Sequence, residues 1–211
     1  MRIQEIFYSI QGESLYAGLP CTFIRTSGCN LRCRWCDTEY AWQGGEERTV
    51  AEVLQQAARY PLQLTEITGG EPLLQPETPA LALALLQRGA SVLVETNGTL
   101  DIDQLPSGCI RIMDIKTPSS GHAHATLWSN VEKLQASDQV KFVIADHGDW
   151  LFCRCIIEEY HLLELCPVLC SPVFGACPAE ALATWILDSR LAVRLQLQLH
   201  KYIWSPERRG V

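Results

Sequence analysis

Residues 28–38 read Gly28-Cys29-Asn30-Leu31-Arg32-Cys33-Arg34-Trp35-Cys36-Asp37-Thr38 and contain three cysteines in the spacing C-x3-C-x2-C. Iron–sulfur clusters are held by cysteine thiolates, normally four of them. A cubic cluster held by only three leaves one iron free to bind something other than protein. A structural zinc site would need a fourth ligand, such as His122, His124 or a later cysteine. The polar residues between the cysteines argue against buried core thiols. The spacing therefore predicts a three-cysteine 4Fe–4S site.

Length and composition limit the classes of protein to which the chain can belong. The chain has 211 residues, a net charge of −7 and a hydrophobic content of 47%, which fits a single domain over residues 1–211. The acidic balance argues against a nucleic-acid surface. The sequence shows neither a signal-peptide pattern nor an apolar stretch long enough for a membrane span. We therefore expect a cytoplasmic protein with no nucleic-acid or membrane partner, and cysteines that are metal ligands or buried thiols rather than disulfides.

Strand-like and helix-like segments alternate along the chain. We expect strands at 21–26, 63–68, 91–95, 109–115, 139–145, 167–169 and 193–199, and helices at 49–60, 79–88, 150–161 and 178–188. This alternation predicts parallel strands with helical crossovers. The chain has fewer strand–helix units than the eight that form a closed TIM barrel. The predicted fold is therefore α/β, a partial, open TIM-like barrel of about six parallel strands with abbreviated helices. Residues 1–7 could add an antiparallel strand.

Unusual tripeptides follow most of the predicted strands. They are the cysteine run, Thr68-Gly69-Gly70, Glu95-Thr96-Asn97, Asp114-Ile115-Lys116, Ser171-Pro172 and His200-Lys201. In parallel α/β barrels the active site is built at the carboxyl ends of the strands. We therefore expect these segments to meet on one face of the molecule.

Two motifs together resemble those of the radical S-adenosylmethionine (SAM) superfamily, namely the cysteine run and Thr68-Gly69-Gly70-Glu71-Pro72. Alone, the paired glycines would indicate only a strand-to-helix turn. The resemblance implies that Cys29, Cys33 and Cys36 hold a 4Fe–4S cluster whose free iron binds SAM, which is cleaved to a 5′-deoxyadenosyl radical. It also implies SAM contacts at Trp35, Cys36, Asp37, Gly70, Glu71, Asp114, Ile115, Lys116, Ser171, Pro172, Val173 and Phe174.

Four further segments are similar to the 7-carboxy-7-deazaguanine synthase family. They are FYSIQGES at 7–14, GLPCTFIR at 18–25, Cys36-Asp37-Thr38 and LQLHK at 197–201. The resemblance covers nearly the whole chain. It implies a lyase of the queuosine and 7-deazapurine pathway that converts 6-carboxy-5,6,7,8-tetrahydropterin to 7-carboxy-7-deazaguanine and releases ammonia. It further implies Mg²⁺, a reducing partner of the flavodoxin or ferredoxin type, and a homodimer.

The same resemblance assigns the substrate site. It implies substrate contacts at Ile10, Gln11, Gly12, Glu13, Arg25, Thr68 and Pro206, and a Mg²⁺ ligand at Thr38. Arg25 suits the substrate carboxylate because a guanidinium can bind it through two hydrogen bonds, although a salt bridge within the barrel is an alternative. Gln11 offers a donor and an acceptor to a pterin edge. A single hydroxyl suits Mg²⁺ poorly without substrate oxygens, and Thr38 could instead cap the following turn.

Two other functions remain open from the sequence. One is a glycyl-radical enzyme activating enzyme, which shares the cysteine spacing but acts on a large protein. The other is a non-catalytic metal-binding interaction protein. The later cysteines, Cys153, Cys155, Cys166, Cys170 and Cys177, lie in or beside apolar segments. We expect them to be mostly buried or scattered thiols, with an additional metal site as the alternative.

Overall fold

One mixed sheet runs through the whole chain. The computed structural model describes residues 1–211, and its nine strands follow the order β3-β1-β2-β4-β5-β6-β7-β8-β9. The sheet is open, because β3 and β9 form its two edges. The strands are β1 Arg2–Ile10, β2 Pro20–Thr26, β3 Glu46–Glu47, β4 Leu64–Gly69, β5 Ser91–Thr96, β6 Ile110–Asp114, β7 Gln139–Ile144, β8 Val168–Pro172 and β9 Arg194–Leu195.

The parallel part of the sheet confirms the predicted fold class. Strands β2 and β4 to β8 form six parallel neighbours, and β1 pairs with β2 in the antiparallel direction. The predicted last strand at 193–199 was wrong beyond Leu195. There the side chain of Gln196 bonds the backbone of Ser14 in both directions, at 2.8 and 2.7 Å, and the ladder ends.

Several crossovers are shorter than a full helix. The α-helices are α1 Val50–Ala57, α2 Thr78–Leu86, α3 His147–Glu159, α4 Leu162–Leu165, α5 Ala179–Ser189 and α6 His200–Ile203. Only 3-10 turns, η3 Ile102–Gln104, η4 Pro118–Ser120, η5 Ala123–Ala125 and η6 Trp128–Lys133, join β5 to β6 and β6 to β7, which confirms the expected abbreviation. The turns η1 Glu39–Ala41 and η2 Pro72–Leu74 lie nearer the N-terminus. None of the helices combines the length and apolar character needed to cross a bilayer.

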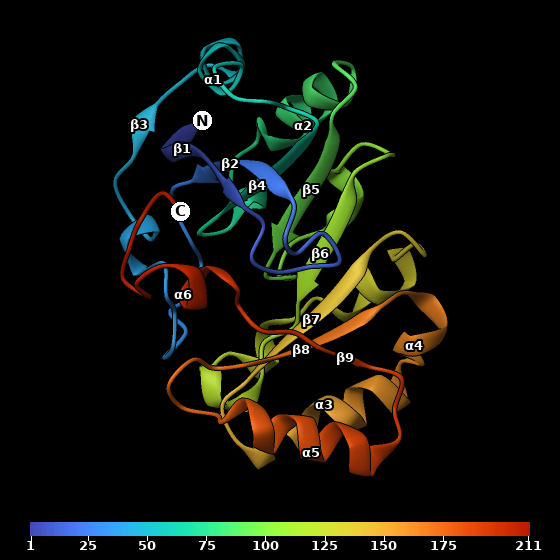
Figure 1. The fold of residues 1–211 in the computed structure, drawn as a ribbon. Coiled ribbons are helices and arrows are strands. Elements are labelled where there is room, and N and C mark those ends of the chain that lie inside the picture. The colour runs from blue at the N-terminus through green and yellow to red at the C-terminus, as the bar shows by residue number, and fades with distance from the viewer.

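The helices cover one face of the sheet and leave the other face open. Figure 1 shows α1 and α2 beside one half of the sheet and α3 and α5 beside β7, β8 and β9. Two large apolar clusters fill these interfaces, one containing Ile24 and Leu81 and the other Phe142 and Trp150. Burying each such side chain contributes roughly 1.5–3 kcal/mol. Along every strand these residues alternate with residues that point to the uncovered face.

That inner face changes from apolar to polar along the strands. Its apolar layer consists of Phe7, Cys21, Phe23, Leu64, Leu93 and Ile112. Because side chains two positions apart share a face, the next inward residues are Arg25 on β2, Glu66 on β4, Glu95 on β5 and Asp114 on β6. The strand pattern thus places a charged layer directly at the carboxyl ends.

The C-terminal segment spans the open side of the sheet. Figure 1 shows that the chain after β9 crosses the molecule to α6, and that α6 lies on the same side as β1 and β3. The Leu199 N–H donates to the Gly12 carbonyl at 3.0 Å. A methyl group on Gly12 would come within 2.3 Å of His200 Nδ1, so glycine lets the two segments cross without displacing the His200 side chain. The turn after β1 and the segment before α6 therefore form one continuous rim.

Candidate active site

A cavity of about 680 Å³ opens at the carboxyl ends of the parallel strands. Small-molecule sites usually enclose about 300–1,000 Å³. The cysteine loop, the turn after β4, the ends of β5 to β7 and the C-terminal segment all contribute walls, as the strand-end pattern predicted. Of the expected site residues, the cavity is lined by Ile10, Gln11, Gly12, Glu13, Arg25, Cys29, Cys33, Trp35, Cys36, Asp37, Thr38, Thr68, Gly70, Asp114, Lys116, Val173, Phe174 and Pro206.

The turn after β4 seats the cysteine loop on the sheet. The Gly70 N–H donates to the Thr26 carbonyl at 3.2 Å, and the Glu71 N–H donates to the Gly28 carbonyl at 2.8 Å. A methyl group on Gly70 would come within 2.2 Å of the Gly28 carbonyl oxygen and 2.9 Å of Cys29 Cβ. The second glycine of the pair is therefore required by close packing against the loop.

The three thiols line the same cavity, although the structure does not draw them together into a metal-holding group. The Leu31 N–H donates to Cys29 Sγ at 3.4 Å, and the Cys36 N–H donates to the Cys33 carbonyl at 3.2 Å. Burial raises the pKa of the Cys29 thiol, and it raises the pKa of Cys33 to about 11 although the Lys116 ammonium opposes the change. Thiolate binding to iron would displace these protons. An N–H donor to sulfur and a nearby cation are the groups that support such ligands.

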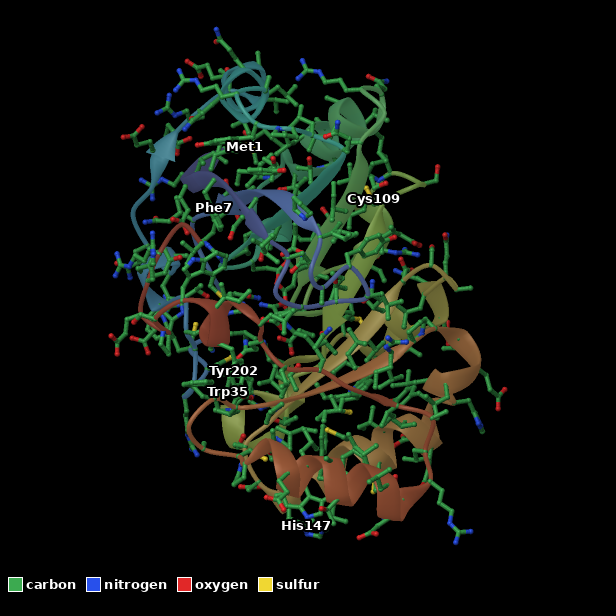
Figure 2. All side chains as sticks on the ribbon, viewed as in Figure 1. Met1, Phe7, Trp35, Cys109, His147 and Tyr202 are labelled. Carbon is green, nitrogen blue, oxygen red and sulfur yellow. The ribbon has the colours of Figure 1, made fainter.

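Trp35 anchors the loop and also lines the cavity. Its indole N–H donates to Ser119 Oγ at 3.0 Å, and Lys116 Nζ lies 5.4 Å from its ring centre. Lys116 in turn pairs with Asp114 at 2.8 Å. Figure 2 shows Trp35 at the margin of the molecule, on the segment that follows β2. Trp35 is thus fixed to the segment after β6 by its indole N–H while its side chain lines the cavity where the SAM contact was expected.

Arg25 reaches the cavity from β2. Its Nε donates to Glu5 Oε1 at 2.9 Å, and the Tyr40 hydroxyl donates to the same oxygen at 2.7 Å. The terminal nitrogens of the guanidinium have no hydrogen-bond partner within the protein. The salt bridge considered as an alternative thus exists, and it leaves the fork of Arg25 free for a carboxylate.

Gln11 and Thr68 are hydrogen-bonded to two glutamates. Glu95 belongs to a strand-end tripeptide that was expected at the site, whereas the sequence pattern predicted no role for Glu66. Gln11 donates its side-chain amide to Glu66 and accepts from the Glu13 N–H at 3.1 Å, and Thr68 donates to Glu95 at 3.1 Å. Burial and then the neighbouring Glu95 raise the pKa of Glu66 to about 8. The period of two along β4 could have found Glu66, which stands two positions before Thr68 on the same face.

Lys141, on β7, is the central cation of an acidic cluster. It contacts Glu95 directly, Glu13 at 3.0 Å and Asp114 at 3.7 Å, and its side chain is 5% exposed. Burial opposes its charge, but these carboxylates outweigh burial and raise the pKa of Lys141 well above its usual value. Burial likewise opposes ionisation of Glu13, yet Lys141 brings the pKa of Glu13 below its ordinary value. The Lys141 ammonium is therefore engaged within the protein.

Asp37 and Thr38 follow the last cysteine and differ in how they are engaged. Asp37 accepts from Lys201 at 2.6 Å, and although burial opposes its charge, Lys201 holds the pKa of Asp37 at about 2. Thr38 precedes η1, but its side chain makes no capping hydrogen bond. The Thr38 hydroxyl has only a 3.8 Å contact with Cys36 Sγ. It is therefore available to a ligand in the cavity.

Four expected SAM contacts do not line the cavity. Glu71 is fully buried and accepts from the Leu73 N–H at 3.0 Å, the Thr96 hydroxyl at 2.8 Å and the Asn97 N–H at 2.6 Å. Its side chain fixes the turn after β5, and its contact with SAM stays a prediction. Ile115, Ser171 and Pro172 are likewise buried away from the cavity. Ile115 and Pro172 alternate with inward residues, whereas Ser171 lies opposite the inward residue Val143 but is fully buried.

The later cysteines are mainly core residues. Cys153, Cys166, Cys170 and Cys177 are buried in the apolar cluster beneath α3 and α5, while Cys155 is exposed. The expectation of buried or scattered thiols is confirmed. Burial raises the pKa of each of the four buried thiols.

Comparison with known proteins places this site in a class. The sequence model of the Radical SAM superfamily matches residues 23–113. The fold is similar to the crystal structure of QueE from Escherichia coli, with a TM-score of 0.78 and 21% identity over 93% of each chain. A structure of TYW1 with a lysine-pyruvate adduct bound has a TM-score of 0.54 at 12% identity, over 71% of this chain and 64% of that chain. The fold and the cysteine loop define a radical SAM protein.

Two curated relatives narrow the class. The chain is 44% identical to a 7-carboxy-7-deazaguanine synthase of Chlorobaculum tepidum, over 100% of this chain and 97% of the relative. It is 40% identical to a 7-carboxy-7-deazaguanine synthase of Koribacter versatilis over the full length of both. The chain belongs to the 7-carboxy-7-deazaguanine synthase family.

Proposed function

We propose that the chain is a carbon–nitrogen lyase of the queuosine and 7-deazapurine pathway. It converts 6-carboxy-5,6,7,8-tetrahydropterin to 7-carboxy-7-deazaguanine and releases ammonia. The names of the relatives support this reaction. The observation that carries it is that one cavity combines the three-cysteine loop with the free guanidinium fork of Arg25 and a layer of carboxyl groups.

The charges of the cavity suit the two ends of this substrate. The substrate carboxylate would bind the terminal nitrogens of Arg25. The aminopyrimidinone end carries N–H donors and a carbonyl, which suit Glu95 and Glu66. With a pKa near 8, Glu66 is largely protonated at neutral pH and offers both a donor and an acceptor. Further proposed contacts, all of which line the same cavity, are Ile10, Gln11, Gly12, Glu13, Thr68 and Pro206.

The cofactors would bind in the same cavity, at the wall formed by the three-cysteine loop. Cys29, Cys33 and Cys36 would hold a 4Fe–4S cluster, and SAM would lie against Trp35, Asp37, Gly70, Asp114, Lys116, Val173 and Phe174, which line the cavity nearby. When bound, these groups would supply the radical chemistry needed to activate C6 of the substrate. The protein's own residues orient the substrate through Arg25, exclude water through the buried walls and hold a proton on Glu66.

Mg²⁺ is a further proposed component, with Thr38 as its protein ligand. Mg²⁺ prefers six oxygen ligands and usually keeps several waters, so one hydroxyl is insufficient. The substrate carboxylate is the natural source of further oxygens. We expect Mg²⁺ binding to depend on substrate. Thr38→Ala should raise the Mg²⁺ concentration needed for turnover, whereas Thr38→Ser should not.

The test is an anaerobic reaction with dithionite, SAM and 6-carboxytetrahydropterin. We expect 7-carboxy-7-deazaguanine and ammonia in equal amounts, and neither with Cys33→Ala. SAM cleavage without consumption of the pterin would reject the substrate and favour the activating-enzyme alternative. Absence of SAM cleavage by iron-loaded protein would favour the non-catalytic alternative.

We further propose a cytoplasmic homodimer that receives electrons from a small redox protein. All ten cysteines are free thiols, as a reducing compartment favours. The edge strand β9 is only two residues long and exposes Leu195, and α6 exposes the apolar side chains of Tyr202 and Ile203. Sedimentation velocity tests the dimer, and a monomer at micromolar concentration would contradict it.

A further inference from the structure

Two side chains near the C-terminus, Gln198 and Lys201, line the cavity but have no role in the proposed reaction. They belong to the segment LQLHK at 197–201. The Lys201 backbone N–H donates to the Gln198 carbonyl at 3.0 Å, which places both residues on one turn. Side chains three positions apart on such a turn lie on the same face. Lys201 Nζ accordingly donates to Gln198 Oε1 at 2.7 Å, and the two side chains form one unit.

Lys201 joins this unit to the cysteine loop. Its ammonium pairs with Asp37 at 2.6 Å, and its side chain is only 9% exposed. Asp37 directly follows Cys36, and the same ammonium lies 5.9 Å from the centre of the Phe174 ring. Asp37 and Phe174 are both among the proposed SAM contacts. Figure 1 shows α6, which contains Lys201, beside the segment that follows β2.

Gln198 joins the same unit to the turn after β1. Its side-chain amide donates to Glu13 Oε1 at 2.9 Å, and the other Glu13 oxygen accepts from Lys141 at 3.0 Å. Gln198 is buried, and Glu13 is among the proposed substrate contacts. A chain of hydrogen bonds therefore runs from Asp37 through Lys201 and Gln198 to Glu13 and Lys141.

The chemistry of this chain makes Lys201 the group that sets its direction. A lysine ammonium only donates hydrogen bonds, so it must meet the carbonyl end of the Gln198 amide. That leaves the NH₂ end of the amide for the Glu13 carboxylate, and turning the amide over would break both bonds. A ligand that fixes Asp37 would therefore also favour, through Lys201, one arrangement of Glu13 at the substrate end of the cavity.

We propose that Lys201 is a positioning residue that couples the two ends of the cavity, so that SAM and the pterin each strengthen the binding of the other. The effect is reciprocal, because a coupling free energy belongs to both ligands equally. The inference rests on the proposed function, since SAM and the carboxylated pterin are the ligands of that reaction. It adds the residue that sets their two sites relative to each other.

The test measures binding rather than turnover. The probe is 6-carboxypterin, an oxidised, fluorescent pterin with no hydrogen at C6, titrated against iron-loaded, unreduced enzyme with and without SAM. The ratio of the two dissociation constants is the coupling factor. We expect a factor of about five or more in the parent and less than about two in Lys201→Met. Lys201→Arg should keep most of the coupling, because a guanidinium can pair with the same carboxylate.

A second variant separates this role from a loss of structure. Gln198→Leu leaves the pair between Lys201 and Asp37 and removes only the link to Glu13, so it should lose the coupling even where Lys201→Met takes up less iron. The control is Lys133→Met, which should keep the factor of the parent, because Lys133 ends η6 and does not line the cavity.

Three outcomes would overturn the proposal. They are a factor below about two in the parent, a parent-like factor in Gln198→Leu, and an equal loss of coupling in Lys133→Met. Failure of the proposed function has a different signature, because a parent that binds SAM but no 6-carboxypterin would reject the substrate itself and this inference with it.

Discussion

Replacing Lys141 with methionine tests whether the acidic layer of the cavity depends on one cation. Methionine has a similar length, so the change removes charge with little loss of packing. Removing one partner of a buried ion pair costs about 3–5 kcal/mol. The partners Glu13 and Glu95 are 19% and 27% exposed, which allows some hydration of the orphaned carboxylates. We therefore expect the lower end, a loss of about 3 kcal/mol of unfolding free energy at pH 8.

The assay is urea unfolding followed by tryptophan fluorescence at pH 8 and pH 5. In the parent protein the pKa of Glu13 is lowered. The stabilisation that ionised Glu13 gives the folded protein is therefore present above the usual pKa of a glutamate and is lost as the pH falls below it. Without Lys141 that pKa should rise, and the deficit of the variant should shrink at pH 5. The control is Lys133→Met, whose partners Asp101 and Asp103 are 55% and 62% exposed. It should cost less than about 1 kcal/mol. Equal losses in both variants, or a pH-independent loss in Lys141→Met, would refute the reasoning.

Three other substitutions probe neighbouring parts of the site. Gly70→Ala should abolish most iron incorporation, because the new methyl group would meet the Gly28 carbonyl. Gly148→Ala is the control. A normal iron content in Gly70→Ala would contradict the packing argument. Because the pKa of Glu66 is raised to about 8 in the folded protein, the parent loses stability as the pH rises from about 4.5 to 8. Glu66→Gln removes this loss and should therefore stabilise the protein at pH 8.5 but not at pH 4.5, as measured by calorimetry. Arg25→Lys should raise KM for the pterin about tenfold, since an ammonium lacks the fork, and an unchanged KM would exclude a bidentate contact.

Much of the fold could be predicted because local patterns and global arrangement agree. In β7 the outward residues Val140, Phe142 and Ile144 are apolar, so the alternation assigns Lys141 to the inner face. Gly70 could be assigned to a close approach because the residue follows a strand and lacks a side chain. The convergence of the strand ends followed from parallel topology alone.

The remaining features depend on contacts between segments far apart in the sequence. Glu71 looked like a ligand residue, but its carboxylate accepts three bonds from neighbouring turns, which no local pattern reveals. Gln196 looked like part of a strand, yet it bonds Ser14, 182 positions away. The particular partners of Arg25 and Lys141 are Glu5 and Glu95, which lie on other strands. Charge pairing across the barrel requires the register of neighbouring strands.

The central claim is that this cavity presents C6 of a carboxylated pterin to a radical formed at the cysteine loop. The most direct measurement uses 6-carboxytetrahydropterin deuterated at C6, with reconstituted enzyme, SAM and dithionite under anaerobic conditions. We predict deuterium in the 5′-deoxyadenosyl group of SAM or of 5′-deoxyadenosine, together with 7-carboxy-7-deazaguanine. Formation of the product with no deuterium in either adenosyl species would contradict the account.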